Sequence, residues 1–318
     1  MPKVSALIPT RNRPVLVERA IRSVLTQTYW DLEVIVVIDG PDSATVRALS
    51  AIDDHRLRII PLETSVGGAE ARNVAARAAR GEWVAYLDDD DEWLPNKVAA
   101  QLQVAEASNR RDSALVVSKF LFRCPGKPDG IRPRRLPAKN ERLCEYMFDF
   151  SCSFQTSTFF CARELMMRIP FSKGLKGHQD LDWFLRATEQ PDTEFRIVEE
   201  ALSVYHVPTG RESVGRSFNW RSSLAWGKAE RRRMTGLGYS RFVVSCCAVR
   251  AVEEKERFRA LPRLLYECAL VGSPSPKTIG LLFLVLFLNP DVRRKLRDLL
   301  FPPPRGPITY DFRSYPHA

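Results

Sequence analysis

Five consecutive carboxylates follow an apolar run in the first third of the chain. The apolar run is Trp83–Leu87, and the carboxylates are Asp88 to Asp91 and Glu92. Such a group repels itself unless a cation or solvent relieves the charge. One interpretation is a solvated loop whose Asp residues cap the next helix. The other is a site whose hard carboxylate oxygens hold Mg²⁺ or Mn²⁺, with water and substrate phosphate as the remaining ligands.

Two more polar features stand beside apolar runs. Asp39 ends the apolar run Leu32–Asp39, and Gly67-Gly68 precedes Arg72. Each feature is weak alone, because a strand-ending Asp is often a turn residue and an Arg after glycines is often a solvated helix cation. Together they favour a nucleotide: Asp39 can accept from a base or ribose, Arg72 can offset negative charge, and the acid run can bind phosphate through a metal.

The elements that must position these groups alternate short β-rich runs with helical periodicity over residues 1–108. The alternation is typical of βαβ units and a mostly parallel sheet, where ligands bind outside the carboxyl ends of the strands. The predicted strands are Val4–Pro9, Leu32–Asp39, Leu57–Leu62 and Trp83–Leu87. The predicted helices are Pro14–Thr26, Ser43–Ala51, one opened by Gly67-Gly68 and ending at Ala79, and Pro95–Ser108.

The middle of the chain continues the sheet with a mixed topology. Its predicted elements are the strands Ser113–Phe122, Ser157–Cys161 and Arg196–His206 and the helix Asp180–Thr188. The segment Cys124–Asn140, with four prolines and a basic run, is predicted to be a mobile loop of open function. The whole is an α/β fold with a mixed, mostly parallel sheet flanked by helices.

Charge is distributed very unevenly. The 318 residues carry a formal net charge of +10, and 45% of them are hydrophobic, which is ordinary globular usage. Lys and Arg balance Asp and Glu up to residue 218, whereas residues 219–305 hold 17 cations against 7 acids. This pattern argues against a chain that wraps nucleic acid along its length and favours a basic C-terminal attachment surface. Five helices are predicted there: Asn219–Arg233, Phe242–Glu256, Arg263–Val271, Thr278–Leu288 and Val292–Phe301.

The sequence also indicates a compartment. Seven cysteines, with no C-x-x-C pair and no matching His spacing, favour neither a disulfide framework nor a zinc site and indicate a reducing cytoplasm. The apolar stretch Val4–Pro9 is too brief for a signal peptide. The longest apolar run, Ile279–Leu288, is half of the ~20 residues that a spanning helix needs. We therefore expect a cytoplasmic protein with no segment that crosses a bilayer.

Several motifs in the first third of the chain resemble family 2 glycosyltransferases of the GT-A fold. The resemblance runs in register over about Val4–Trp93. It rests on Val4–Arg13, Ser23–Tyr29, Glu33–Gly40, Gly67–Asn73 and Tyr86–Trp93. It implies a nucleoside diphosphate sugar donor, with a UDP or dTDP type favoured, an Mg²⁺ or Mn²⁺ ion, and transfer with inversion at the anomeric carbon.

The resemblance also implies roles for individual residues. Thr10 and Asp39 would line the nucleoside pocket, Arg72 would approach the donor, and Asp88-Asp89-Asp90 would be the D-x-D motif. A small residue such as Ser usually stands where this chain has Asp89, which leaves open whether Asp90 or Asp91 is the principal metal ligand. The donor-binding set implied by the motifs is Pro9, Thr10, Arg11, Asp39, Arg72, Asp88, Asp89 and Asp90.

A catalytic base is implied further along the chain. The family places an Asp, commonly after Glu, at a helix start about ninety residues beyond the metal motif. Here the match is Gln179-Asp180, so Asp180 would deprotonate the acceptor hydroxyl, with Gln179 in place of the usual Glu. Asp182 is the rival carboxylate, although a first-turn acid is also favoured by the helix dipole alone. His206, at a predicted strand end, is more simply structural than a metal ligand, and residues 209–216 resemble a lid over the donor.

The C-terminal region combines its cations with apolar helices, including Ile279–Leu288 next to Arg293-Arg294-Lys295. One interpretation is a packed helical appendage with a solvated basic face. The other is interfacial binding to an anionic membrane, which gains from apolar burial and from the attraction of cations to lipid headgroups. Such docking would bring the active site to a lipid-linked glycan at the inner face of the membrane.

The sequence as a whole favours an inverting, metal-dependent glycosyltransferase for a glycan or lipid-linked acceptor, as in the synthesis of cell-surface polysaccharide. The alternatives are a nucleotidyltransferase, which would release pyrophosphate, and a non-catalytic sugar-nucleotide-binding assembly protein. Residues 1–112 would bind the nucleotide sugar, 113–218 would complete the same GT-A domain with the acceptor and catalytic half, and 219–318 would associate with the membrane.

Overall fold

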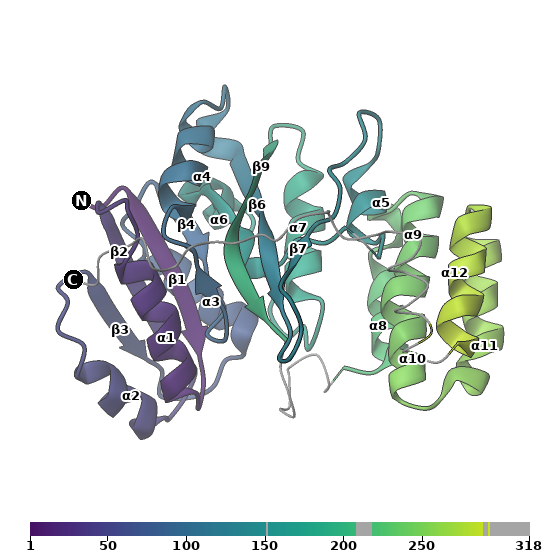
Figure 1. Ribbon diagram of the computed structural model, residues 1–318, viewed down its shortest axis with the longest axis horizontal. Coiled ribbons are helices and arrows are strands. Elements are labelled where there is room, and N and C mark those ends of the chain that lie inside the picture. The colour runs from purple at the N-terminus through teal and green to yellow at the C-terminus, as the bar shows by residue number, and fades with distance from the viewer. Residues whose placement is uncertain (151, 208–217, 289–291, 293–318) are drawn as a thin grey trace.

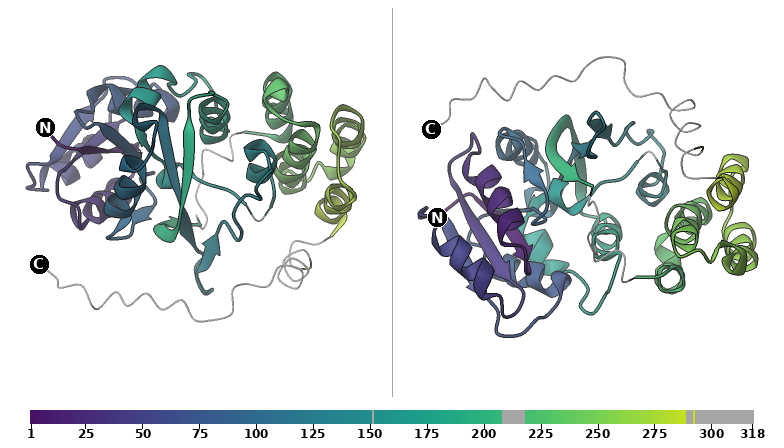
Figure 2. Two further views of the ribbon diagram at one scale, coloured as in Figure 1. Left: turned by 90° about the horizontal axis from the view of Figure 1, so that it is seen from above. Right: turned by 60° about the horizontal axis from the view of Figure 1, so that its bottom comes forward.

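The computed structural model describes residues 1–150, 152–207, 218–288 and 292. The predicted lid at 209–216, the predicted helix Val292–Phe301 and the basic triplet at 293–295 lie outside these residues, apart from residue 292. A sheet with flanking helices forms one end of the molecule, and α8 to α12 gather at the other, with α5 and α7 nearer to them (Figure 1). The two views of Figure 2 show the same separation.

The N-terminal part of the sheet has the predicted βαβ order. Its parallel strands are β1 (Val4–Thr10), β2 (Leu32–Ile38), β3 (Leu57–Pro61) and β4 (Trp83–Tyr86), in the spatial order β3-β2-β1-β4. The connecting helices are α1 (Pro14–Leu25), α2 (Ser43–Ser50) and α3 (Gly68–Ala78). The order reverses direction between β1 and β4, and such a switch point opens a crevice at the carboxyl ends of the strands.

The second part of the sheet is mixed. The antiparallel β8 (Phe160–Ala162) joins β4 to β6 (Ala114–Arg123), which pairs in parallel with β9 (Glu194–His206). Helices α4 (Lys97–Glu106), α6 (Arg163–Arg168) and α7 (Gln179–Thr188) belong to this part. The main hydrophobic core contains residues from both parts of the sheet. Strands such as β2 are buried along their whole length, as is typical of parallel sheets.

Four short elements escaped the sequence analysis. The segment predicted to be a mobile loop contains β7 (Gly130–Arg132), which extends β6 as an antiparallel hairpin, and β5 (Glu92–Trp93) pairs with β9 directly after the acid run. Helices α5 (Leu143–Met147) and α6 are also short. Each is too brief for hydrophobic periodicity to reveal it. The predicted strand 157–161 is partly a 3-10 turn, Thr156–Thr158, before β8.

The C-terminal helices build a second hydrophobic core. They are α8 (Trp220–Ala229), α9 (Gly236–Phe242), α10 (Val249–Glu253), α11 (Arg257–Tyr266) and α12 (Pro276–Phe287), with π-helical turns at Val243–Ala248 and Glu267–Val271. The prediction that one helix begins at Arg263 was wrong. In the structure α11 starts at Arg257 and contains Pro262, a residue that usually disfavours a helix interior. Within the described part of the chain, no helix is both long and apolar enough to span a bilayer.

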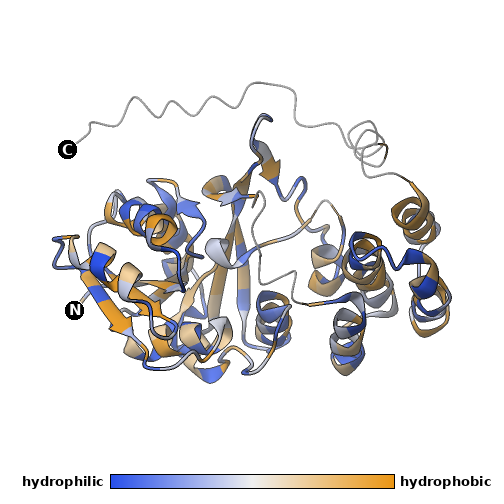
Figure 3. Cartoon of the chain, turned by 90° about the horizontal axis from the view of Figure 1, so that it is seen from below, coloured by the Kyte–Doolittle hydropathy of each residue, from blue (hydrophilic) through white to orange (hydrophobic). Residues whose placement is uncertain are grey.

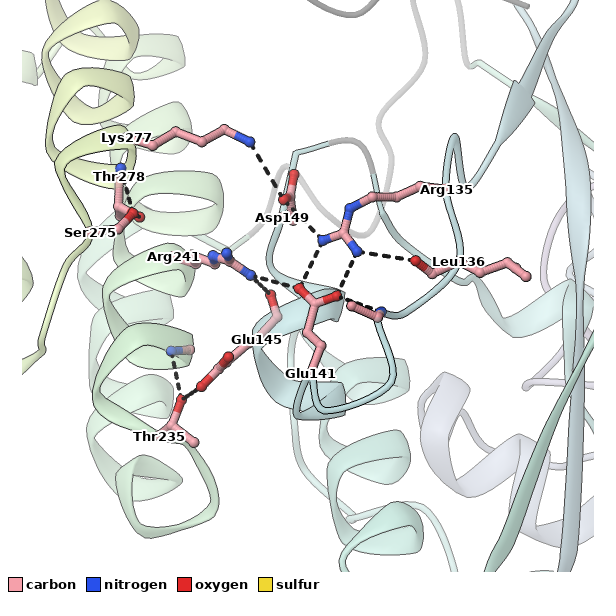
Figure 4. Close-up of polar contacts among 12 residues, drawn as sticks. Arg135, Leu136, Glu141, Glu145, Asp149, Thr235, Arg241, Ser275, Lys277 and Thr278 are labelled. Carbon is pink, nitrogen blue, oxygen red and sulfur yellow. Dashed lines mark hydrogen bonds and ion pairs between the residues drawn. The ribbon is translucent and has the colours of Figure 1, made fainter.

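Ion pairs fasten the C-terminal helices to the segment that precedes and includes α5 (Figure 4). Glu141 accepts from Arg135 and, at 3.1 Å, from Arg241 of α9. Hydrogen bonding from Arg135 lowers the pKa of Glu141 to about 2. Lys277 of α12 lies 4.0 Å from Asp149, which also pairs with Arg135. The helical region is therefore held to the sheet domain by charges as well as by apolar packing.

Candidate active site

A cavity of about 740 Å³ lies at the carboxyl ends of β1, β2 and β4. The residues that line it come from these strand ends, from the start of α3, from the loop before α7 and from β9. All eight donor-binding residues predicted from the sequence line this cavity: Pro9, Thr10, Arg11, Asp39, Arg72, Asp88, Asp89 and Asp90. The tertiary structure thus brings together residues that are about eighty positions apart in the chain.

The acid run turns sharply after β4. The Asp88 N–H donates to Ser157 Oγ at 3.1 Å, and the Asp91 N–H closes a turn onto the Asp88 carbonyl oxygen at 3.1 Å. Trp93 then enters β5, and its indole N–H donates to the carbonyl of Ser157. The four aspartates are therefore held in a tight loop in which neighbouring side chains point in different directions.

Asp88 is linked to the start of α7 through Arg72. Its Oδ1 accepts from Arg72 Nη2 at 2.5 Å, and Arg72 Nη1 donates to Gln179 Oε1 at 3.0 Å. Gln179 is the first residue of α7. The guanidinium of Arg72 therefore links the acid loop to the start of α7, where a Glu in place of Gln179 would add a further negative charge.

Asp89 and Asp90 share one cation. Arg13 Nη1 donates to Asp89 Oδ1 at 2.8 Å and to Asp90 Oδ2 at 3.1 Å, and Thr10 Oγ1 donates to Asp89 Oδ2 at 2.7 Å. Asp89 is buried, which raises its pKa to about 6 although Arg13 opposes the shift. Asp90 is more open, with a third of its side chain exposed. Burial and the charge of Asp88 raise its pKa.

Asp91 lies beneath the loop. Its carboxylate accepts from Ser157 Oγ at 2.6 Å and from the His206 N–H at 3.2 Å, and 1% of the residue is exposed. Burial, with the charge of Asp88, raises its pKa well above the usual range. Asp91 is absent from the cavity lining, unlike the three aspartates before it. Its contacts favour a role in holding the acid loop onto β9.

Asp39 organises the loop before α3. Its carboxylate accepts from Ser65 Oγ at 2.9 Å and from the backbone N–H groups of Val66 and Gly67 at 2.6 and 3.1 Å. Gly67 has φ +84°, a conformation that favours glycine, and α3 begins directly after it. Arg11 also donates to Ser65 Oγ, at 2.8 Å. Asp39 therefore shapes this side of the cavity through the loop and retains acceptor capacity for a ligand.

Asp180 stands in the first turn of α7, next to the cavity-lining Gln179. Burial raises the pKa of Asp180, the charge of Asp88 adds to the shift, and Arg72 opposes it. The rival Asp182 points elsewhere: it is buried and accepts from Ser172 Oγ at 2.7 Å and from Arg186 Nε at 2.9 Å. The contacts of Asp182 are thus with its own helix and with the segment before it, whereas the charges of Asp88 and Arg72 act on Asp180.

The residue before α7 is held by the C-terminal helices. His178 has the left-handed φ of +57°, and its ring lies 4.9 Å from Phe218, 4.8 Å from Trp226 and 5.7 Å from Phe242. Its Nε2 lies 3.0 Å from Ser223 Oγ. Burial in this cage lowers the pKa of His178 to about 3. The start of α7 is thus fixed by Phe218 and by side chains of α8 and α9.

Three polar or charged residues that line the cavity were not assigned to the site by the sequence analysis: Arg13, Lys176 and Tyr205. Arg13 belonged to a quoted motif, and its position three residues after Thr10 was the available signal. Tyr205 lies in the predicted strand Arg196–His206, but the local sequence does not show that this strand passes beside the acid loop. Burial and then the charges of the nearby aspartates raise the pKa of Tyr205 to about 12. His206 pairs with Glu92, Nε2 to Oε1 at 2.6 Å, which is a structural contact.

The carboxylates in the cavity fit a divalent cation that takes most of its ligands from phosphate. Asp88 and Asp90 present hard oxygen atoms to the same cavity, and their mutual repulsion is relieved only in part by Arg13 and Arg72. Among the described residues, no three His, Cys, Asp or Glu side chains converge as a complete metal site. A cation here would therefore depend on the ligands that a bound diphosphate brings.

Known proteins match this chain in both sequence and fold. Residues 5–173 match the family model described as glycosyl transferase family 2. WcaA of Escherichia coli K12, provisionally named as a glycosyl transferase of colanic acid biosynthesis, is 30% identical over 67% of this chain and 75% of its own length. WfgD of Escherichia coli, named as a UDP-Glc:α-D-GlcNAc-diphosphoundecaprenol β-1,3-glucosyltransferase, is 34% identical over 33% of this chain and 42% of its own.

Two solved structures share the fold at low sequence identity. Staphylococcus aureus TarS in complex with UDP-GlcNAc has a TM-score of 0.61 and 17% identity, covering 92% of this chain and 83% of that one. The mannosyltransferase PcManGT of Pyrobaculum calidifontis, in complex with GDP-Man and Mn²⁺, has a TM-score of 0.54 and 18% identity over 94% and 79% of the two chains. These matches confirm the predicted α/β sheet architecture.

Proposed function

The chain belongs to glycosyl transferase family 2, a family of GT-A-fold glycosyltransferases, and we propose that it transfers a sugar from a nucleoside diphosphate sugar with inversion at the anomeric carbon. One observation carries the proposal: the predicted donor residues line a single cavity. Asp180 is not among the lining residues but follows the cavity-lining Gln179 in the first turn of α7. The comparison with TarS supports a UDP-type donor, because that relative in fold binds UDP-GlcNAc. A dTDP-type donor presents the same diphosphate and a similar base.

In the proposed reaction, Asp180 accepts the proton of an acceptor hydroxyl. The hydroxyl oxygen then forms the new bond to the anomeric carbon while the bond from that carbon to the phosphate oxygen breaks. The electron pair leaves with the nucleoside diphosphate. The raised pKa of Asp180 suits this role, since burial makes its carboxylate a stronger base than an exposed one.

The donor phosphates lie, in this proposal, between Asp88, Asp90 and the arginines that face them. Asp90 and Asp88 would hold Mg²⁺ or Mn²⁺, and Asp91 would keep its place beneath the loop rather than bind the ion directly. The cation supplies positive charge that stabilises the departing diphosphate. Arg72 orients Asp88 and Gln179, and Arg13 fixes Asp89 and Asp90 through paired hydrogen bonds.

The relatives favour a role in the synthesis of a cell-surface polysaccharide. WcaA carries a name from colanic acid biosynthesis, and the acceptor in the name of WfgD is a sugar on diphosphoundecaprenol. We propose a glycan or lipid-linked acceptor for this chain too, used at the inner face of the membrane. Residues 1–112 would bind the donor, 113–218 would supply the base and the acceptor site, and 219–318 would contact the membrane.

A panel of nucleotide sugars tests the donor assignment without knowledge of the acceptor, because slow transfer to water replaces transfer to a glycan. We expect metal-dependent release of nucleoside diphosphate from a UDP or dTDP sugar. Release of pyrophosphate would instead identify a nucleotidyltransferase. Binding without turnover, in the presence of several candidate acceptors, would identify a non-catalytic binding protein. If no nucleotide sugar is bound or hydrolysed with Mg²⁺ or Mn²⁺, the proposal is wrong.

A further inference from the structure

Two C-terminal helices expose apolar side chains on a shared surface. Phe258, Tyr266 and Leu270 lie on α11 and the π-helical turn that continues it, and they are 65%, 49% and 75% exposed. Ile279, Phe283 and Phe287 lie on α12 and are 40%, 45% and 47% exposed. We call these six residues the outer apolar face. Figure 3 colours α12 as hydrophobic over most of its length.

Contacts between the rings join the two helices into one surface. The Phe258 ring lies 6.4 Å from that of Phe287, and Phe287 lies 6.1 Å from Phe283. The spacing along α12 is four residues, which keeps Ile279, Phe283 and Phe287 on one side of that helix. The outer apolar face passes from α12 to α11 at the contact between Phe287 and Phe258.

This surface is not part of the core of the helical region. The opposite sides of the same helices supply that core, with Ala260 and Leu264 of α11 and Leu282 and Leu286 of α12 almost fully buried. A helix on the surface of a globular protein normally turns polar residues outward. An extended exposed apolar patch marks a surface that contacts another phase or another molecule.

Cations border the outer apolar face. Arg257 lies over the ring of Phe258 at 4.8 Å, Arg263 lies over Tyr266 at 5.5 Å, and Arg259 is exposed between them. Residues 255–288 hold five cations and two acids. One acid, Glu267, is buried and paired with Lys228 and Arg263. The other, Glu256, pairs with Arg221.

We propose that the outer apolar face inserts into the headgroup region of an anionic lipid bilayer, with α11 and α12 lying in the plane of the surface. The pattern of aromatic and aliphatic side chains flanked by arginines is that of interfacial helices, which combine apolar burial with attraction to acidic lipids. This proposal identifies the surface that would make the membrane contact of the proposed function. It rests on the proposed function only for the biological purpose of that contact.

Vesicle flotation of the full chain tests the proposal. The probes are phosphatidylcholine vesicles with and without phosphatidylglycerol. We expect binding to the acidic vesicles that weakens with added salt. The variant Phe258→Ser, Phe283→Ser, Phe287→Ser should lose at least about tenfold in partitioning, from the lost apolar burial. The variant Arg257→Gln, Arg259→Gln should lose about fivefold per cation removed.

A matched control uses exposed apolar residues far from this surface. Val15 on α1 and Trp30 before β2 are 77% and 69% exposed, so the variant Val15→Ser, Trp30→Ser removes similar apolar area and should bind vesicles like the parent. Donor hydrolysis in lipid-free solution should be equal in all variants. This readout separates a failure of the docking face from a failure of the catalytic proposal, and it also shows that the triple variant is folded.

Three results would overturn the proposal. The first is that the parent does not float with acidic vesicles. The second is that the triple Phe variant floats as well as the parent does. The third is that the parent is dimeric without lipid and the triple Phe variant is monomeric, while both bind vesicles equally. That outcome would assign the outer apolar face to a second copy of the chain.

Discussion

The two ends of the active site are held by different parts of the molecule. At the donor end, the aspartates after β4 are tied to β1 and α1 by Thr10 and Arg13, within the first hundred residues. At the end that carries the proposed base, Asp180 is the second residue of α7, and the residue before α7, His178, is enclosed by rings from Phe218 and the C-terminal helices. The donor end is thus a property of the βαβ units, whereas the base end depends on a second hydrophobic core.

This difference separates binding from transfer. A change confined to the base end should leave donor affinity intact and reduce turnover, because its residues do not hold the diphosphate. A change to an aspartate of the acid loop that lines the cavity should abolish both. Arg72 is the exception, since it contacts Asp88 at one end and Gln179 at the other.

The largest effect is expected at the donor end. Asp90→Ala should abolish metal-dependent binding of UDP, because it removes an anionic ligand from a site that otherwise relies on phosphate and water. Calorimetry with UDP and Mn²⁺ measures this. The matched control is Asp91→Asn, which keeps the shape of a buried side chain outside the cavity and should retain binding. If the two variants exchange these results, Asp91 is the principal ligand.

At the base end, Asp180→Asn should lower transfer by about 10²–10⁴-fold, the usual contribution of a positioned general base. Affinity for UDP and Mn²⁺ should not change, and Asn is an equally good residue for a helix start. The assay compares turnover of the donor with its binding constant. Normal turnover in this variant would remove Asp180 from the mechanism.

The control for this experiment is Asp182→Asn. Asp182 is buried and paired with Arg186 and Ser172, so its loss should reduce the free energy of unfolding rather than the chemical step. This assignment differs from the simple first-turn acid that the sequence suggested. If Asp182→Asn loses transfer and Asp180→Asn retains it, the base lies on α7 but is Asp182 rather than Asp180.

A smaller effect is expected at His178. His178→Ala should lower transfer by up to about 10²-fold through displacement of Asp180, with donor affinity unchanged. His178→Asn should recover much of the loss, because Asn tolerates the left-handed backbone and can still hydrogen-bond Ser223. Turnover and UDP affinity are measured for both variants. A parallel fall in affinity and turnover would show that the two ends are not independent.

The smallest effect concerns acid stability. The folded pKa of His178 is about 3, below the ordinary value of 6.5, so the unfolded chain takes up a proton first as pH falls below 6.5. The free energy of unfolding should therefore decrease toward acid, by about 2 kcal/mol between pH 7 and pH 5 from this residue. Denaturant unfolding of the parent and His178→Asn at both pH values isolates it. An equal decrease in both proteins contradicts the prediction.

Much of the donor end could be predicted because its information is local. Alternating apolar runs revealed β1 to β4, and a parallel sheet places the residues after each strand at one edge. Asp39, Arg72 and the acid run could therefore be assigned to one site before their contacts were known. The helix Asp180–Thr188 was also predicted from its pattern, but the role of Asp180 was implied only by the resemblance to a family motif.

Other features could not be read from local patterns. Periodicity shows that α12 is apolar but not that Ile279, Phe283 and Phe287 face outward while Leu282 and Leu286 face the core. The motif also left open which aspartate binds metal. In the structure, Asp91 turns inward because Ser157 and the β9 backbone supply its hydrogen bonds.

The sequence by itself determined the order of the longer strands and helices and the excess of cations near the C-terminus. It also determined which polar residues follow the apolar strands. These depend on backbone preferences and on side-chain spacing within one element. Only the tertiary structure decided the enclosure of His178, the direction of each aspartate and the place of Tyr205 beside them. Such features arise from contacts between segments far apart in the chain, where burial and hydrogen bonding select one of several orientations that the local sequence allows equally.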